Sequence, residues 1–162
     1  MKYLHYELYN KASVANEEEA EPFQRKFEEQ YKKYLEEYNL LKEQLPKRFL
    51  KEFAKKNFHD NIITSFDVSM KRPRTKSEYT AVMKMTDYGN RNIQHILMFY
   101  NVRKIQSTLE FDSISGACDW LYCEILPIDN KMMSLEVLLF HDSTLYLEFR
   151  HLKYKKLLIK DS

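Results

Sequence analysis

Glycine is scarce in this chain of 162 residues, which contains only Gly89 and Gly116. Glycine-rich phosphate-binding loops need several glycines at fixed spacing, because the backbone must approach the phosphates closely. Neither a G-x-G-x-x-G run nor a Walker-A run can be written with two distant glycines. The sequence therefore excludes these two nucleotide-binding motifs.

Cysteine and long hydrophobic runs are also scarce. The two cysteines, Cys118 and Cys123, would lie about 16 Å apart along an extended segment, which is too far for a disulfide. Free thiols are typical of a reducing compartment. No run approaches 18 consecutive apolar residues, and the N-terminal segment lacks the apolar region of a signal peptide. We therefore expect a cytoplasmic protein without a membrane partner.

Neither sign of charge dominates. The chain has 26 Lys and Arg against 24 Asp and Glu, a net charge of +2, and the balance also holds separately within residues 1–56 and 57–162. Proteins dedicated to nucleic-acid binding usually carry a large basic excess. Nucleic acid is therefore not an expected partner.

Aromatic residues are abundant, with 12 Tyr and 10 Phe. Apolar side chains recur every three or four residues in one segment, at Phe23, Phe27, Tyr31, Tyr34, Tyr38, Leu41 and Leu45. This spacing predicts a long amphipathic helix whose aromatic stripe packs on a sheet, with tyrosine hydroxyls reaching the edge of the contact. After Pro46, a short second helix is predicted over roughly 47–56. Residues 3–12 fit a short strand or a helical turn equally well.

The apolar period changes to two after residue 57, which predicts strands. Six are expected, near 62–68, 79–86, 94–103, 120–126, 133–139 and 145–149, with a seventh short strand or a frayed end in the tail. Short connections favour an antiparallel meander. The predicted fold is α+β: a helical segment, 1–56, packed on a twisted antiparallel sheet or partial barrel of about six strands, 57–162, in one compact domain.

Several segments together resemble a family of uncharacterised bacterial proteins, a domain of unknown function. The similar segments are Met1-Lys2-Tyr3 with Glu7-Leu8-Tyr9, the tyrosine-rich helix ending in Leu45-Pro46, Phe58-His59-Asp60 before Ile62-Ile63, Trp120 to Glu124, and Leu138-Leu139-Phe140. The resemblance implies a bacterial protein and brings no known activity or cofactor, so no cofactor is expected. Similar strand starts also occur in small bacterial domains thought to act as immunity proteins against toxins.

The tripeptide Phe-His-Asp occurs twice, at 58–60 and 140–142, each time before a polar residue and a predicted strand. His59, Asp60, His141 and Asp142 could together supply metal ligands or the acid and base of a hydrolase. An Asp before Asn or Ser is also ordinary turn chemistry, with the preceding Phe anchored in the core. The turn is the favoured interpretation, and a metal site is not expected.

A basic cluster and one carboxylate are further candidates. The cluster is Lys71, Arg72, Arg74 and Lys76 on a predicted hairpin loop, which could bind phosphate or an acidic partner; a solvated loop is the more ordinary explanation. Glu124 stands between apolar neighbours on a predicted strand, and an inward-pointing carboxylate would be a catalytic candidate. Otherwise it is a rim residue paired with Lys or Arg.

No catalytic motif emerges, while a broad sheet and an aromatic-rich helix offer large surfaces. The function expected from the sequence is a non-enzymatic protein-interaction module, of which an immunity-type protein is one specific version. The alternative is a metal-binding protein or hydrolase that uses the His-Asp pairs. An uncovered edge strand could also pair two copies as a homodimer.

Overall fold

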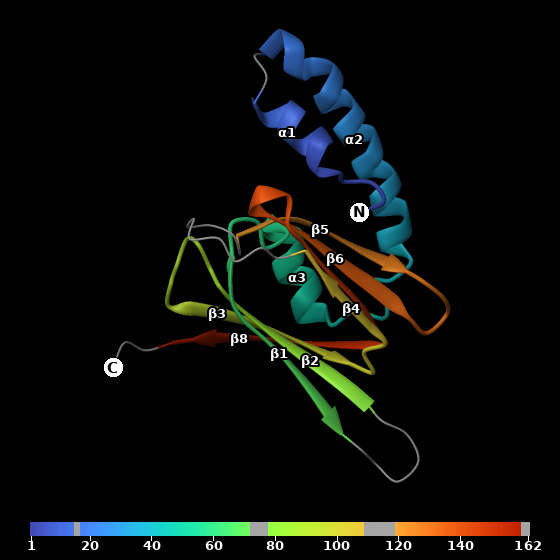
Figure 1. Cartoon of the computed structure of the whole chain (residues 1–162), viewed down its shortest axis with the longest axis vertical. Coiled ribbons are helices and arrows are strands. Elements are labelled where there is room, and N and C mark those ends of the chain that lie inside the picture. The colour runs from blue at the N-terminus through green and yellow to red at the C-terminus, as the bar shows by residue number, and fades with distance from the viewer. Residues whose placement is uncertain (15–16, 72–77, 109–118, 160–162) are drawn as a thin grey trace.

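The computed structural model of the chain describes residues 1–14, 17–71, 78–108 and 119–159, and it confirms the α+β class. Within these ranges three helices come first: α1 (Tyr6–Val14), α2 (Glu17–Asn39) and α3 (Lys47–Lys56). Residues 3–12, ambiguous in the sequence, therefore contain the start of a helix. Figure 1 shows α1 and α2 as a hairpin that projects from one end of the β-structure, while α3 lies beside the strands.

In the described part of the chain the strands form two antiparallel sheets of four strands each. The first sheet has the order β1 (Ile62–Lys71), β2 (Glu78–Thr86), β3 (Ile93–Tyr100) and β8 (His151–Leu158). The second has the order β4 (Lys104–Ser107), β7 (Thr144–Phe149), β6 (Met133–Leu139) and β5 (Trp120–Pro127). β3 lies between two strands, as its apolar character on both faces predicted.

The two sheets continue into each other at one corner. There the Arg103 N–H donates to the Glu148 carbonyl (2.9 Å), and the Arg150 N–H donates to the Tyr100 carbonyl (3.0 Å). These two bonds continue the backbone hydrogen bonding of the β3–β8 pair into that of the β4–β7 pair. An isolated bridge between Ile62 and Asp119 links the far ends of the two sheets. Within the described ranges the barrel is not closed, so the two sheets form a partial barrel.

The strand order differs from the simple meander expected. The chain leaves β4 and returns at the opposite end of the second sheet, in β5, so the later strands β7 and β8 pair with β4 and β3. β8 forms where a short strand or a frayed end was expected. Its pattern is hard to recognise in the sequence because only Leu152 and Tyr154 of the strand are buried, with His151, Lys153 and Lys155 around them.

The aromatic stripe of α2 packs on β5, as predicted, but two details differ. α2 ends at Asn39, and Leu41 and Leu45 are buried from the turn that follows. Tyr34 is fully buried, and its hydroxyl accepts a hydrogen bond from the Ile125 N–H (3.3 Å) instead of reaching the edge. A buried hydroxyl needs such a partner, since leaving it unpaired is costly.

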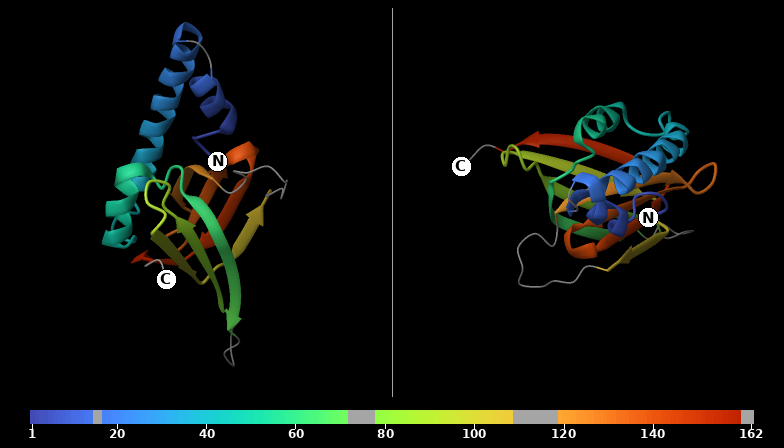
Figure 2. Two further views of the ribbon diagram at one scale, coloured as in Figure 1. Left: turned by 90° about the vertical axis from the view of Figure 1, so that its left-hand side faces the viewer. Right: turned by 90° about the horizontal axis from the view of Figure 1, so that it is seen from above.

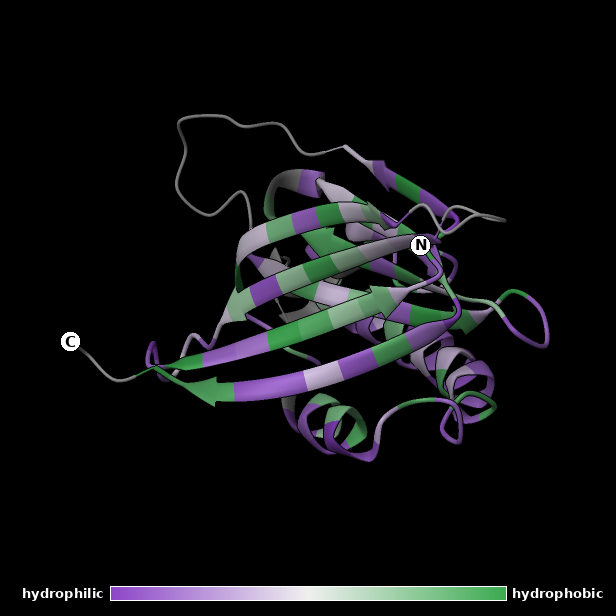
Figure 3. Cartoon of the chain, turned by 90° about the horizontal axis from the view of Figure 1, so that it is seen from below, coloured by the Kyte–Doolittle hydropathy of each residue, from purple (hydrophilic) through white to green (hydrophobic). Residues whose placement is uncertain are grey.

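One hydrophobic core joins the helical segment to the strands. It contains Tyr34 and Phe49 from the helices together with Trp120, Phe99 and Phe149 from the sheets. Figure 3 shows apolar and polar residues alternating along the strands. In β2 and β3 of the first sheet this alternation gives one buried face and one more exposed face. β5 and β6 of the second sheet are instead buried at most positions on both faces.

Candidate functional site

The β1–β2 hairpin exposes apolar side chains at the edge of the first sheet, where β1 pairs, among the described residues, with β2 alone. It projects at the end of the molecule opposite α1 and α2 (Figure 1 and Figure 2). Val68, Met70 and Tyr79 are 51%, 41% and 43% exposed, and we call these three residues the hairpin surface. Large apolar side chains beside an open strand edge are typical of a site that another chain covers.

The exposure follows from the length of the hairpin. β1 and β2 pair in regular register from Ser65 to Lys71, with Met70 opposite Tyr79. β3 covers β2 only from Thr80 onward, where Thr80 pairs with Tyr100. Met70 and Tyr79 therefore lie beyond the last β2–β3 pair, while Val68 lies opposite Ala81 on the edge strand, and all three core-facing side chains reach solvent.

Two hollows lie beside the hairpin surface. One, of about 510 Å³, is lined by Glu78, Tyr79, Asn101, Val102, Arg103, Met132 and Arg150. The other, of about 270 Å³, is lined by Val68, Tyr79, Val102, Arg103, Lys104 and Ile105. Tyr79, Val102 and Arg103 line both, so the exposed apolar patch runs into a recess with basic side chains around it.

Arg103 is held in place by a carboxylate. Its Nε lies 2.7 Å from Glu148 Oε2, and the Tyr146 hydroxyl donates to the other oxygen (2.9 Å). Burial alone would raise the pKa of Glu148, but these two hydrogen bonds lower it overall. Glu148 therefore stays ionised at neutral pH and fixes the Arg103 side chain at the wall of both hollows.

One member of the predicted basic cluster, Lys71, lies at the end of β1 in this hairpin. Lys71 ends β1, is exposed, and stands opposite Glu78 of β2. Arg72, Arg74 and Lys76 lie outside the described residues. The structure thus places one member of the cluster, next to the hairpin surface.

The Glu124 side chain points inward, as the catalytic hypothesis required, but its carboxylate accepts hydrogen bonds from the backbone. It is 1% exposed and accepts hydrogen bonds from the N–H groups of Lys2 (2.7 Å), Tyr3 (2.7 Å) and Leu4. Across the β5–β6 ladder it faces Glu136, whose carboxylate lies 2.8 Å from the amino group of Met1. The arrangement positions the segment before α1.

The two Phe-His-Asp turns flank the start of β5. The Asp60 N–H donates to the Trp120 carbonyl (2.8 Å), and the Phe140 N–H donates to the Asp119 carbonyl (3.1 Å). His59 Nδ1 lies 2.8 Å from Asp60 Oδ1. Burial raises the pKa of Asp119, and the negative charge of Asp60 adds to the rise. The turns lie on opposite sides of one strand end.

The described side chains do not gather into a metal centre at these turns. No group of three or more His, Cys, Asp or Glu side chains within the described part of the chain is placed to hold a metal ion. Asp142 is exposed, and the His141 side chain lies outside the described residues. The predicted anchoring of the preceding Phe is right for Phe58, which is 3% exposed, and wrong for Phe140, which is 44% exposed. Phe140 belongs to a short 3-10 turn, which points its ring outward.

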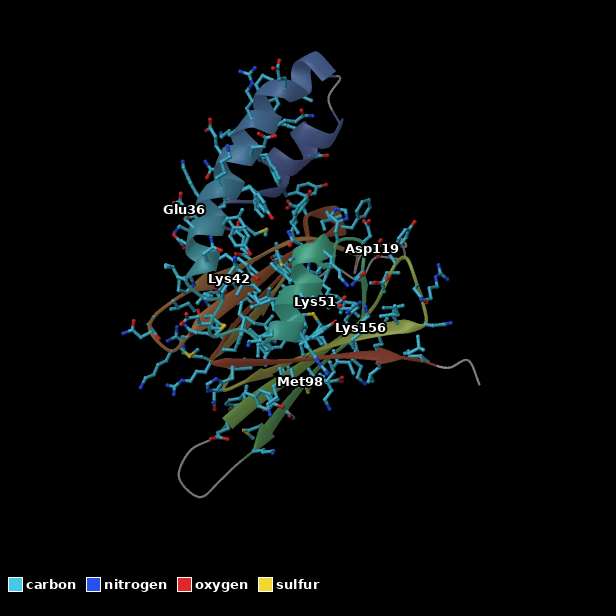
Figure 4. All side chains as sticks on the ribbon, turned by 180° about the vertical axis from the view of Figure 1, so that it is seen from behind. Glu36, Lys42, Lys51, Met98, Asp119 and Lys156 are labelled. Carbon is cyan, nitrogen blue, oxygen red and sulfur yellow. The ribbon has the colours of Figure 1, made fainter. Side chains whose placement is uncertain are left out.

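A buried network of hydrogen-bonded polar side chains under α3 was not predicted from the sequence. His95 Nδ1 lies 2.6 Å from the Tyr154 hydroxyl, and Nε2 lies 3.4 Å from Asp87 Oδ2. It borders a hollow of about 130 Å³ in which Lys156 donates to Glu52 (3.0 Å); Figure 4 shows Lys156 on β8 beside α3. The sequence signal that could have identified His95 is its spacing of two from Leu97 and Phe99, which places all three side chains on the buried face of β3.

We expect His95 to make stability pH-dependent below about pH 7. Burial lowers the pKa of His95, and the hydrogen bond with Asp87 opposes this only in part. Below the ordinary pKa of 6.5, the unfolded chain binds the proton first, so the free energy of unfolding falls as the pH falls. Urea unfolding of His95→Gln should show a shallower pH slope over this range. His151→Gln, at an exposed position, is the control and should keep the wild-type slope.

Comparison of the chain with protein-family models, curated proteins and solved structures found no match. The resemblance to a bacterial family of unknown function therefore remains a sequence-based expectation. Among the helices that the structure describes, none combines the length and apolar character needed to cross a membrane.

Proposed function

We propose that this protein is a non-enzymatic protein-interaction module of the bacterial cytoplasm, and that a partner protein binds at the hairpin surface. The observation that carries the proposal is the exposure of Val68, Met70 and Tyr79 on an open strand edge. Covering such side chains is favourable by about 25 cal/mol per Å² of apolar surface removed from water. The immunity-type version of the proposal makes the partner a toxin.

The state of two reactive groups favours binding over catalysis. Glu124 uses its carboxylate on three backbone N–H groups. Cys123 is fully buried, and burial raises its pKa well above the ordinary value, so the nucleophilic thiolate is not formed at neutral pH. The apolar side chains exposed at the β1 edge are then the feature that the internal packing of the fold does not account for.

The test compares two exposed apolar positions. Tagged wild-type protein, Val68→Glu and Leu40→Glu are each used to capture partners from the native cells, and a captured partner is then purified and titrated against all three. Leu40 is exposed in the turn after α2, far along the chain from the hairpin. We expect Val68→Glu to weaken binding at least about tenfold, because a charge must then be buried in the interface.

Leu40→Glu should bind like the wild type. The proposal fails if repeated capture recovers no stoichiometric partner, whether another protein or an untagged copy of this chain. It fails equally if the purified partner binds wild type and Val68→Glu with the same affinity, with both proteins shown to be folded by circular dichroism.

A further inference from the structure

The outer edge of β1 has a self-complementary pattern of side chains. From Ser65 to Lys71 the strand is regular, and its strand partner within the described ranges is β2 alone. Asp67, Ser69 and Lys71 alternate with Val68 and Met70, and all five are exposed. Proteins usually blunt such an edge with bulges, prolines or inward-pointing charges. Here the bulge precedes Ser65, and the core-facing positions 68 and 70 are apolar.

We propose that β1 pairs antiparallel with β1 of a second copy of this chain, about a two-fold axis at Ser69. This inference rests on the proposed function and names the partner at the hairpin surface. In this register Asp67 lies opposite Lys71 of the second copy, and the symmetry repeats the pair. Val68 lies opposite Met70 of the second copy, also twice. The result is a continuous sheet from β8 of one copy to β8 of the other.

The charge pattern selects this register over its neighbours. An axis at Asp67 would place two aspartates directly opposite each other, which is destabilising. An axis at Val68 would pair Asp67 with Ser69 and leave Lys71 opposite Ser65, with no opposite charges matched. The axis at Ser69 is the one among these three that opposes Asp67 with Lys71.

The same register extends the apolar row across the interface. Within one copy Met70 stands opposite Tyr79, and Val68 stands opposite the fully buried Ala81. Across the interface the apolar side chains then form one row, which runs from Tyr79 and Met70 of one copy to Val68 and Ala81 of the second copy. On the other face, Lys71 would lie between Glu78 of its own hairpin and Asp67 of the second copy. The apolar face and the charged face of β1 are then each complementary to the same face of β1 in the second copy.

Charge reversal and its rescue test the dimer. We measure the mass of full-length protein by light scattering and its dissociation constant by sedimentation, expecting twice the 19.7 kDa of one chain. Asp67→Lys and Lys71→Asp each create two like-charge pairs, so each should raise the dissociation constant about tenfold. The double variant swaps the two charges and restores both pairs; made together with Glu78→Gln, because Glu78 stands opposite position 71 in the same hairpin, it should return to within about threefold of wild type.

Crosslinking tests the register separately. Ser69→Cys brings two thiols together at the axis, so a short thiol crosslinker should link the copies. Thr64→Cys, five residues from the axis, would place its two thiols about 33 Å apart along the strands and should stay at the wild-type background.

Three outcomes distinguish the ideas. Rescue by the double variant together with linkage at position 69 supports the dimer. A dimer that ignores the single reversals, or that the double variant fails to restore, overturns this register. A monomer at every concentration overturns the self-pairing, while the proposed function still stands if Val68→Glu abolishes binding of a different partner.

Discussion

Replacing Phe58 by Ala should lower the free energy of unfolding by about 3–5 kcal/mol, the usual cost of deleting a fully buried phenylalanine ring. The Phe58 ring lies within 6.1 Å, centroid to centroid, of five other rings, namely Phe49, Phe53, His95, Trp120 and Tyr154. These rings come from α3, β3, β5 and β8, so the loss would loosen the contact between the helical segment and both sheets. Urea unfolding at constant m-value measures the change.

The duplicated tripeptide supplies the matched control. Phe140 has the same neighbours in sequence, His and Asp, but is 44% exposed, and Phe140→Ala should cost about 1 kcal/mol or less. Equal shifts in the urea midpoint for the two variants would contradict the assignment of Phe58 as the ring that joins helix and sheets.

The Phe58 turn also shows backbone strain that its packing must offset. Asn57, Phe58 and Asp60 all have positive φ, at 49°, 57° and 66°. For a bulky residue such as phenylalanine this region is unfavourable, and strain of this kind persists only where the surroundings hold it. The buried ring of Phe58 and the hydrogen bond from Asp60 to Trp120 provide that hold.

Local patterns predicted the α+β class because both periods are strong in the sequence. The apolar spacing of α2 and the alternation in β2, β3 and β6 identify each element without any knowledge of its neighbours. The bounds of α3, Lys47–Lys56, also agree with the predicted range of 47–56, because Pro46 marks its start.

Pairing between distant segments determined the features that local sequence patterns could not predict. The exposure of Met70 and Tyr79 depends on where β3 ends, and it ends before Asn101, which adopts positive φ (53°). The pairing of β8 with β3 joins residues 51 to 65 positions apart, and no local pattern contains it. The same holds for His95, whose partner Tyr154 is 59 positions away.

Glu124 is the strongest case of a role fixed by distant residues, since its partners Lys2, Tyr3 and Leu4 lie 120 or more positions away. Glu124→Ala should lower the free energy of unfolding by roughly 3–5 kcal/mol, because it removes a charged acceptor from three backbone donors. Glu124→Gln keeps one acceptor oxygen but turns an N–H donor toward the third amide, so we expect a smaller loss of about 1–3 kcal/mol.

Two measurements separate this anchoring role from a general loss of packing. Urea unfolding should give the order Ala, Gln, wild type from least to most stable, while Glu28→Gln at an exposed position of α2 should match the wild type. Hydrogen exchange should accelerate at the amides of Lys2, Tyr3 and Leu4 in Glu124→Gln before it changes in β3. Lys2 and Tyr3 keep a second attachment through Glu37, so the segment should loosen without detaching. Unchanged exchange at these three amides, or a Glu124→Ala midpoint equal to that of Glu28→Gln, would show that the carboxylate does not hold this segment.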